Sequence, residues 1–217
     1  SCAGHLLSLV NDVLDLSKIN KGKLTLCERA FDLRQMLTLV REIALPDARE
    51  AGLSLEFHLD PQLGTYAVGD ELKLRQVLIN LLSNAVKYNR RGGRVDLRVM
   101  RVQPRQGAEQ VYFCVEDTGI GVEAAFARHI FDDYAREGRA SADGVGLGLN
   151  IAWHLVKLMG GELRLESEVG RGSRFFFTIA LPMAAALPDD AENCAPSASL
   201  KDKTLLIVED NPTNLYI

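Results

Sequence analysis

Polar side chains that suit phosphate and metal chemistry recur along one stripe of a strongly helical segment. Between Glu71 and Tyr88, the residues Asn80, Asn84 and Lys87 follow one another at steps of four and three, which places them on one face of an α-helix. An amide oxygen is a hard ligand suited to Mg²⁺, and an ammonium group adds a positive charge for phosphate. A solvated helix face would look similar, so this stripe alone favours a binding site only slightly. The opposite arc is apolar: Leu74, Leu78, Leu81, Leu82 and Ala85.

A carboxylate followed by two glycines ends an apolar, strand-like run. Asp117 closes the run, and Gly119 and Gly121 come directly after it. A carboxylate can accept a hydrogen bond from an exocyclic amine, and glycines allow tight turns and a close approach of the backbone to a ligand. The pattern Asp-x-Gly-x-Gly occurs in many turns, so alone it is a weak indication of a site.

A second glycine-rich segment leads straight into a helix. Gly144, Gly146 and Gly148 precede a helix expected from about Leu149 to Met159, and the N–H groups and dipole at a helix N-terminus favour phosphate. The segment lacks the lysine of the P-loop and does not follow a first strand as the dinucleotide-binding fingerprint does. It therefore predicts a phosphate-binding loop of another kind.

The elements that must position these residues alternate between helix and strand signals. Asp32, with Gln35 three residues later, predicts a helix cap, and the segment 169–172 predicts a hairpin turn. The remaining expectations are strands at 23–31, 53–59, 94–102, 110–116, 162–168 and 173–181, helices at 33–43, 71–88 and 149–159, and a long loop with a short helix at 117–148. Helices combined with an antiparallel or mixed sheet predict an α+β two-layer sandwich.

Both ends of the sequence differ from this pattern. Leu6, Leu9, Val13 and Leu16 recur at steps of three and four, which predicts an amphipathic helix that needs a partner helix. Residues 183–202 are rich in Ala, Pro, Asp and Ser and predict a linker. An apolar run at 204–208 then begins a second domain. The expected division is therefore 1–22, 23–182, 183–202 and 203–217.

Composition bounds the class of protein. Of the 217 residues 47% are hydrophobic and 25% charged, which is typical of a globular protein. The net charge of −4 disfavours a nucleic-acid partner. Four scattered cysteines without a C-x-x-C pair favour a reducing compartment and disfavour a zinc site. No apolar run reaches the length that spans a bilayer. Because the sequence starts without Met and ends inside an apolar run, we expect a fragment of a longer protein.

The motifs, taken in order, resemble the catalytic, ATP-binding domain of sensor histidine kinases, in the superfamily that includes gyrase, Hsp90 and MutL. Residues 74–88 resemble its N box, 117–121 its G1 box, 131–134 its F box, 144–149 its G2 box and 172–175 its closing strand. The flanks are similar to the second helix of the dimerisation and phosphotransfer hairpin (6–19) and to the first strand of a receiver domain (204–211). The resemblance implies a hybrid histidine kinase with the Bergerat ATP-binding fold.

This resemblance implies a role for each motif. Asp117 would hydrogen-bond the adenine amino group, Tyr88 would pack on the adenine ring, Asn84 with Asn80 would hold Mg²⁺, and Lys87 would neutralise phosphate charge. Asn80, Asn84 and Lys87 are thus the expected catalytic residues. The other expected ATP contacts are Gly119, Ile120, Gly121, Tyr134, Arg136 (or Arg139), Gly144, Val145, Gly146, Leu147, Gly148 and Ser173. Glu209 and Asp210 would form the incomplete acidic metal pair of the receiver.

Asn80 separates two branches of the superfamily. Gyrase-like ATPases carry a Glu at this position to activate water, and an amide cannot act as a general base, so a kinase is favoured over an ATPase. None of the four histidines is followed by an acidic residue, as the family's phospho-accepting histidine is, so we expect the acceptor upstream. The receiver's phospho-accepting Asp would likewise lie beyond 217. Val145 stands where the family often has Ser or Thr.

An alternative is a kinase-like, nucleotide-binding interaction module that regulates a partner kinase by dimerisation with little or no catalysis. In both readings the expected partners are a second kinase chain, in a homodimer or heterodimer through 6–19, and the protein's own or a downstream receiver. The expected location is the cytoplasmic portion of a sensor kinase anchored in the inner membrane through segments absent from this sequence.

Overall fold

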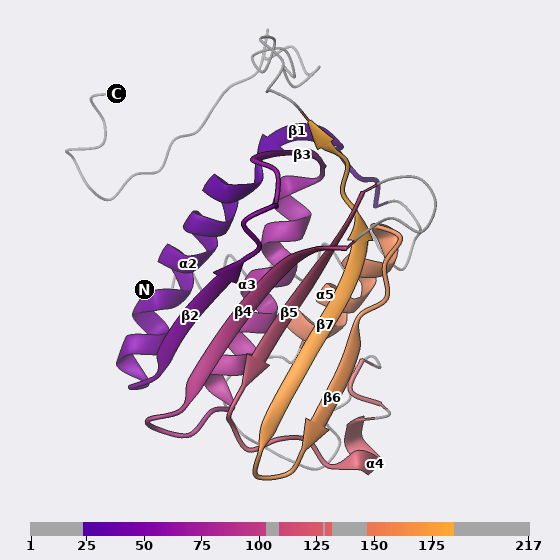
Figure 1. The fold of residues 1–217 in the computed structure, drawn as a ribbon. Coiled ribbons are helices and arrows are strands. Elements are labelled where there is room, and N and C mark those ends of the chain that lie inside the picture. Colours follow the sequence, from indigo (N-terminus) through magenta and orange to yellow (C-terminus); the bar gives the residue numbers. More distant parts are fainter. Residues whose placement is uncertain (1–23, 103–108, 128, 132–146, 185–217) are drawn as a thin grey trace, which may run out of the picture. The chain divides into compact units, whose positions relative to one another are not determined.

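The structure is a computed structural model that describes residues 24–102, 109–127, 129–131 and 147–184. A five-stranded sheet and a layer of helices form the main body (Figure 1). The strands lie in the order β2 (Ser54–Leu59), β4 (Arg94–Val102), β5 (Gln110–Asp117), β7 (Gly172–Ala180) and β6 (Arg164–Glu168). β2 pairs with β4 in parallel and the other pairs are antiparallel. The predicted α+β two-layer sandwich is therefore confirmed.

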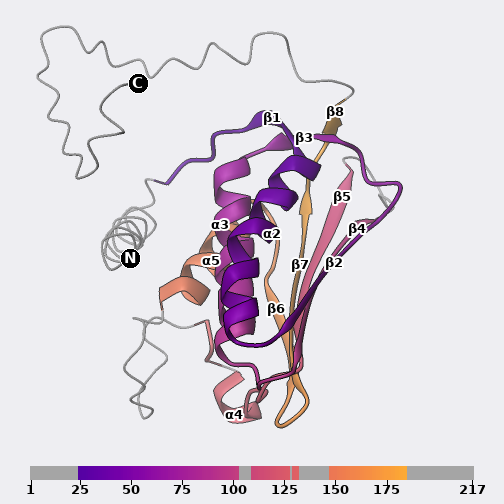
Figure 2. The same ribbon diagram turned by 90° about the vertical axis from the view of Figure 1, so that its left-hand side faces the viewer.

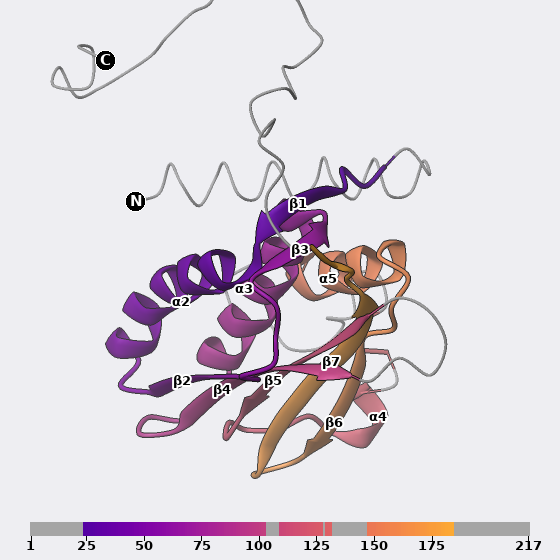
Figure 3. The same ribbon diagram turned by 45° about the horizontal axis from the view of Figure 1, so that its top comes forward.

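Three helices cover one face of this sheet, as the views in Figures 2 and 3 show. They are α2 (Leu33–Glu50), α3 (Glu71–Lys87) and α5 (Leu147–Leu158). A small sheet of β1 (Arg29–Asp32), β3 (Tyr66–Gly69) and β8 (Met183–Ala184) lies at one end, and the short helix α4 (Ala124–Ala127) follows β5 in the chain.

Alternation along the strands determines which face is buried. On β4, Val95, Leu97 and Val99 are fully buried, whereas Arg98 is half-buried and Met100 exposed. Successive side chains of a strand point to opposite faces, so the first set packs under the helices and the second lies on the uncovered face. The core continues across the sheet, where the rings of Phe113 and Phe177 stack at a centroid distance of 5.1 Å.

Two aspartates cap the helices that begin the fold. The Asp32 carboxylate accepts the backbone N–H of Gln35 at 2.8 Å, and the Asp70 carboxylate accepts that of Lys73 at 3.0 Å. Such caps satisfy N–H groups that have no partner within the helix and contribute about 1 kcal/mol each. The predicted start at Asp32 is thus confirmed, and α3 ends one residue before the predicted end.

Several predicted boundaries need correction. The strand expected at 23–31 is β1, which forms only at Arg29–Asp32, and α2 runs seven residues past its expected end and includes Pro46. β3 and β8 were not predicted, because four- and two-residue strands carry too little periodicity. Since Met183 pairs with Ala67, the folded domain extends past residue 182, where the linker was expected to begin.

Some expectations lie outside the described residues: the helix at 6–19, the linker beyond 184, the receiver strand at 204–208 and most of the long loop. Among the described residues, no helix combines the length and apolar character needed to cross a membrane.

Candidate functional site

The polar residues Asn80, Asn84 and Lys87 of α3 lie outside the buried core, as their spacing predicts. Leu78, Leu81 and Leu82 are fully buried against the sheet and neighbouring helices, whereas Asn80 and Asn84 are half-buried. Burial of the leucine face fixes the rotation of the helix. Packing on one side of α3 therefore presents both amides on the other side.

α5 begins beside Asn80, the first residue of this stripe. The Asn80 side-chain amide Nδ2 donates to the backbone oxygen of Gly148 at 3.0 Å. A Cβ added to Gly148 would lie 3.3 Å from both Cγ and Oδ1 of Asn80, so the absence of a side chain permits the close approach. Because Nδ2 is engaged with Gly148, the other atom of the amide, Oδ1, is the one left for a cation.

Asp117 lies at the end of β5 and is 7% exposed. Its Oδ1 accepts the backbone N–H of Gly119 at 2.8 Å and that of Ser173 at 3.3 Å. Both bonds end on Oδ1, so within the described part of the chain Oδ2 has no donor and can accept one from a ligand. Burial raises the pKa of this carboxyl, while the two backbone N–H groups lower it and the neighbouring Glu116 adds a smaller increase.

The glycines after Asp117 are required by close backbone contacts. A Cβ on Gly119 would lie 2.3 Å from the backbone oxygen of Tyr88, which itself accepts the N–H of Ile120 at 3.1 Å. Gly121 has a φ of +70°, and a Cβ there would lie 2.1 Å from the Glu168 oxygen. The turn after β5 is therefore fastened to the end of α3 and to β6.

The side chains at the end of α3 lie beside this turn. Tyr88 is 39% exposed and Ile120 is 54% exposed, and the Lys87 ammonium lies 5.7 Å from the centre of the Tyr88 ring. An exposed ring and an exposed aliphatic side chain next to a buried carboxylate are the groups that a flat heterocycle with an amino substituent would contact.

Two residues of this region were not singled out from the sequence. The Ser167 hydroxyl donates to the Gly172 oxygen at 2.9 Å, lies 3.0 Å from the Ser173 hydroxyl and accepts the Val122 N–H at 2.8 Å. Ser167 thereby joins β6, β7 and the glycine turn. The only sequence signal was a polar residue at a core-facing position of β6.

The second such residue is Asn150, which is 4% exposed. Its Nδ2 donates to the Phe131 oxygen at 2.7 Å, and its Oδ1 is buried without a hydrogen-bond partner among the described residues. Asn150 thus holds the described residue of the predicted F box against α5. A lone Asn in an apolar helix was its only sequence signal.

The remaining predicted contacts lie outside the described residues: Tyr134, Arg136, Arg139, Gly144, Val145, Gly146, Glu209 and Asp210. Leu147 begins α5.

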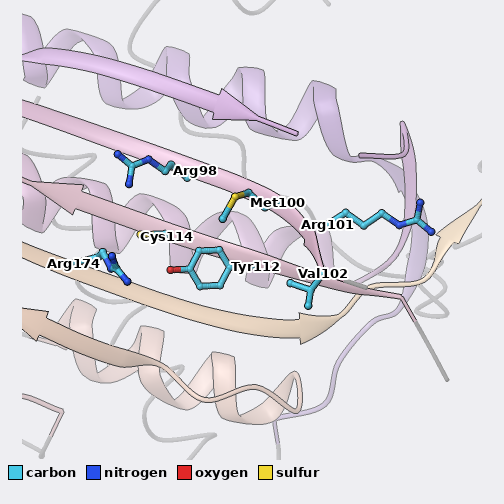
Figure 4. Close-up of a pocket in the computed structure, with 7 residues that line it drawn as sticks. All are labelled: Arg98, Met100, Arg101, Val102, Tyr112, Cys114 and Arg174. Atoms are coloured by element: carbon cyan, nitrogen blue, oxygen red, sulfur yellow. The ribbon is translucent and has the colours of Figure 1, made fainter. Parts of the chain in front are cut away.

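A hollow of about 550 Å³ lies on the uncovered face of the sheet (Figure 4). It is lined by Arg98, Met100, Arg101, Val102, Tyr112, Cys114 and Arg174. Burial raises the pKa of Tyr112 to about 12 and also raises that of the Cys114 thiol. These groups stay neutral near pH 7 and supply neither a base nor a nucleophile, so the hollow is separate in place and chemistry from the candidate site.

The fold and these contacts define an α+β domain whose polar site is framed by α3, the end of β5 and the start of α5. Residues 69–184 match the family described as histidine kinase-, DNA gyrase B-, and HSP90-like ATPase. The chain belongs to this family.

Curated proteins that are similar to this chain are named sensor kinases. The chain is 33% identical to the autoinducer 2 sensor kinase/phosphatase LuxQ of Vibrio cholerae, over 100% of this chain and 26% of that protein. It is 37% identical to the sensor histidine kinase AruS of Pseudomonas aeruginosa, over 96% of this chain and 21% of that protein. The chain thus spans about a quarter of the length of these curated relatives.

Solved structures of histidine kinases share the fold. Full-length ShkA in complex with AMPPNP is 36% identical, with a TM-score of 0.72 over 84% of this chain and 37% of that chain. The Acinetobacter baumannii histidine kinase AdeS, at 22% identity and a TM-score of 0.66 over 82% of this chain and 79% of that chain, supports the fold alone.

Proposed function

We propose that this chain is the ATP-binding catalytic domain of a hybrid sensor histidine kinase, which transfers the γ-phosphoryl group of ATP to a histidine of a dimerisation helix. The observation that carries the proposal is Asp117, a buried carboxylate with one oxygen left to accept a hydrogen bond. The relatives are named sensor kinases, and ShkA, which has the same fold, is in complex with an ATP analogue.

Asp117 and the turn after it would select the base. The exocyclic amine of adenine donates hydrogen bonds, and Oδ2 of Asp117 is the acceptor that the fold leaves for it. Tyr88 and Ile120 offer apolar surface to the ring. A base that presents a carbonyl oxygen in place of the amine would leave a buried acceptor facing another acceptor, which costs about 1–3 kcal/mol.

The amides of α3 fit Mg²⁺ in donor chemistry. Asn84 and the Oδ1 atom of Asn80 are neutral oxygen donors on one stripe, and Mg²⁺ keeps most of its ligands as water and phosphate oxygens. When bound, the ion supplies charge neutralisation at the phosphates. Lys87, at the end of the same helix, would add a positive charge.

The groups that this chain contributes are suited to positioning. Phosphoryl transfer depends mainly on alignment and charge neutralisation. An amide at position 80 cannot take a proton from water, and its Nδ2 is held by Gly148, so Asn80 would orient the phosphate end without promoting hydrolysis. The γ-phosphoryl group would then persist until an acceptor histidine arrives.

The wider organisation is part of the same proposal. Residues 1–22 would belong to the dimerisation hairpin, 23 to about 184 to the catalytic domain, the segment up to 202 to a linker, and 203–217 to a receiver with its acidic pair Glu209 and Asp210. The chain would act in the cytoplasmic portion of a membrane-anchored sensor kinase, as a homodimer or heterodimer, with its own or a downstream receiver as partner.

The proposed site is tested by binding of a fluorescent ATP analogue with Mg²⁺. Asn84→Ala and Asp117→Asn should each weaken binding at least about tenfold, as expected for losing one hydrogen bond to a charged group or one metal ligand. Thr38→Ala, which removes an exposed hydroxyl on α2, and Glu116→Gln, on the other face of β5, are the matched controls and should bind as the wild type does. Unchanged binding in both site variants would refute the proposed site.

Transfer is tested separately with γ-labelled ATP and the protein extended to include the hairpin and its histidine. Label that appears on histidine and is lost with Asp117→Asn supports the kinase. Nucleotide binding without any label would favour the interaction module that regulates a partner kinase.

A further inference from the structure

Three metal-ligating side chains gather on the uncovered face of the sheet, away from the candidate ATP site. Glu56 and His58 lie two residues apart on β2, and Asp96 is the residue of β4 paired with Glu56. Residues two apart on a strand, and residues directly paired across neighbouring strands, share a face. The parallel register of β2 and β4 therefore brings two carboxylates and an imidazole together.

The separations in this cluster suit a shared cation better than a hydrogen bond. His58 Nε2 lies 3.5 Å from Asp96 Oδ1 and 3.6 Å from Glu56 Oε2, and one ligand atom from each residue lies within 4.8 Å of the others. Ligands about 2.1 Å from a tetrahedral zinc ion are about 3.4 Å apart. A well-formed hydrogen bond between these atoms would be about 2.7–3.2 Å long.

The burial of Asp96 is a second observation that points to a ligand in this cluster. It is 2% exposed, and its buried Oδ1, the atom that faces His58, has no hydrogen-bond partner among the described residues. A buried oxygen without a partner destabilises the folded state, and more strongly when it carries a charge. A cation held between Asp96 and His58 would satisfy it.

The surrounding contacts orient the ligands. Arg94 Nε lies 2.8 Å from Asp96 Oδ2, which turns Oδ1 toward His58, and the Ser54 hydroxyl lies 3.4 Å from Glu56 Oε1. Partners of this kind hold ligands in place at metal sites. The nearby Arg98 directs its Nη1 to Glu116 at 2.6 Å and lies 3.8 Å from Asp96 through Nη2.

We propose that Glu56, His58 and Asp96 form a binding site for a zinc-like divalent cation. One imidazole and two carboxylates match Zn²⁺ and its first-row neighbours, whereas Mg²⁺ and Ca²⁺ prefer oxygen alone. His58 is half exposed, so water completes the coordination. Since β2 is the edge strand of the five-stranded sheet, the ion clamps this edge to β4.

The test is titration of the full chain with Zn²⁺ by calorimetry, without nucleotide. We expect one ion per chain with heat that His58→Gln and Glu56→Gln each reduce, weakening the affinity at least about tenfold. Both side chains are half exposed, so neither change threatens folding. Controls are Glu166→Gln, a carboxylate on the same face in β6, and His154→Gln, a histidine of α5 that does not belong to the cluster. Both should leave the affinity within about twofold.

A second measurement uses Co²⁺ as the probe. Visible absorption typical of four-coordinate Co²⁺ should appear with the wild type and disappear with His58→Gln, and Zn²⁺ should raise the melting temperature of the wild type alone. Absence of binding, or equal affinity in the wild type and both cluster variants, would overturn the assignment. The outcome does not depend on the ATP site, because no residue is shared.

Discussion

At the scale of single residues, Asp117 combines burial with a ligand-facing oxygen, and the combination has a cost. Burial raises its pKa above the usual 3.8, so the folded protein holds the proton more tightly than the unfolded chain does. Stability therefore falls as the pH rises from the unfolded pKa through the raised folded value. The charged form that the function needs is the less favourable one for the fold.

Asp117→Asn should consequently stabilise the protein at neutral pH while it weakens ATP binding. The amide oxygen can still accept the N–H groups of Gly119 and Ser173, but no charge is buried. The measurement is urea unfolding from about pH 4 to about pH 7. The gain in stability over the wild type should be smallest at low pH and grow as the pH rises. A variant that instead loses stability relative to the wild type with rising pH would show that the carboxylate charge stabilises the fold.

At the scale of elements, the turn after β5 requires a glycine at position 121 for two reasons: its positive φ and its close contact with β6. Gly121 and Gly170 have similar positive φ angles, +70° and +80°. A Cβ at Gly121 would meet the Glu168 oxygen at 2.1 Å, whereas one at Gly170 would meet nothing within 4 Å. The two positions share the conformational cost of alanine and differ in the clash.

Gly170→Ala should cost about 1–2 kcal/mol through its backbone conformation alone. Gly121→Ala should cost a further 1–3 kcal/mol, roughly the penalty of overpacking, and should also weaken ATP binding because the turn must move. Chemical unfolding and analogue binding measure the two effects. Equal losses in the two variants would mean that the contact with β6 relaxes freely and does not position the turn.

At the scale of the whole molecule, the candidate site joins elements from both halves of the domain. α3 and the end of β5 meet at the Tyr88 backbone, and the start of α5 meets α3 at Asn80. A ligand that binds these elements only when they are assembled stabilises the folded state by mass action.

ATP with Mg²⁺ should therefore raise the melting temperature. At a ligand concentration of about 100 Kd, binding adds about 2.7 kcal/mol to the free energy of unfolding. This gain corresponds to a rise in melting temperature of roughly 5–10 °C for a domain of this size. Differential scanning fluorimetry measures the shift. Removing Mg²⁺ with a chelator, or changing Asn84 to Ala, should diminish the shift, and the control Thr38→Ala on α2 should preserve it. If neither the removal of Mg²⁺ nor Asn84→Ala changed the shift in melting temperature, the nucleotide would bind elsewhere.

Local patterns in the sequence were enough to predict α2, α3, α5 and most strands, although α2 continues seven residues past its expected end. The cap at Asp32, the leucine face of α3 and the glycine hairpin at 169–172 each depend on residues close together in the sequence, so they can be predicted without knowledge of the fold. The α+β class and the family followed from the order of these patterns. β3 and β8 are not predicted, because these short strands form only by pairing with each other and with β1, which are far apart in the sequence.

Only the tertiary structure decided which distant groups meet. It joins Asn80 to Gly148, 68 residues away, and joins Asp117 to Ser173, 56 residues away. It also pairs Glu56 with Asp96 through the parallel register of β2 and β4. The cluster of these two residues with His58 is not predicted from the sequence, because Asp96 is far from the other two along the chain. Such contacts depend on strand register and on the packing of helices against a sheet, which are properties of the assembled chain and have no local signature.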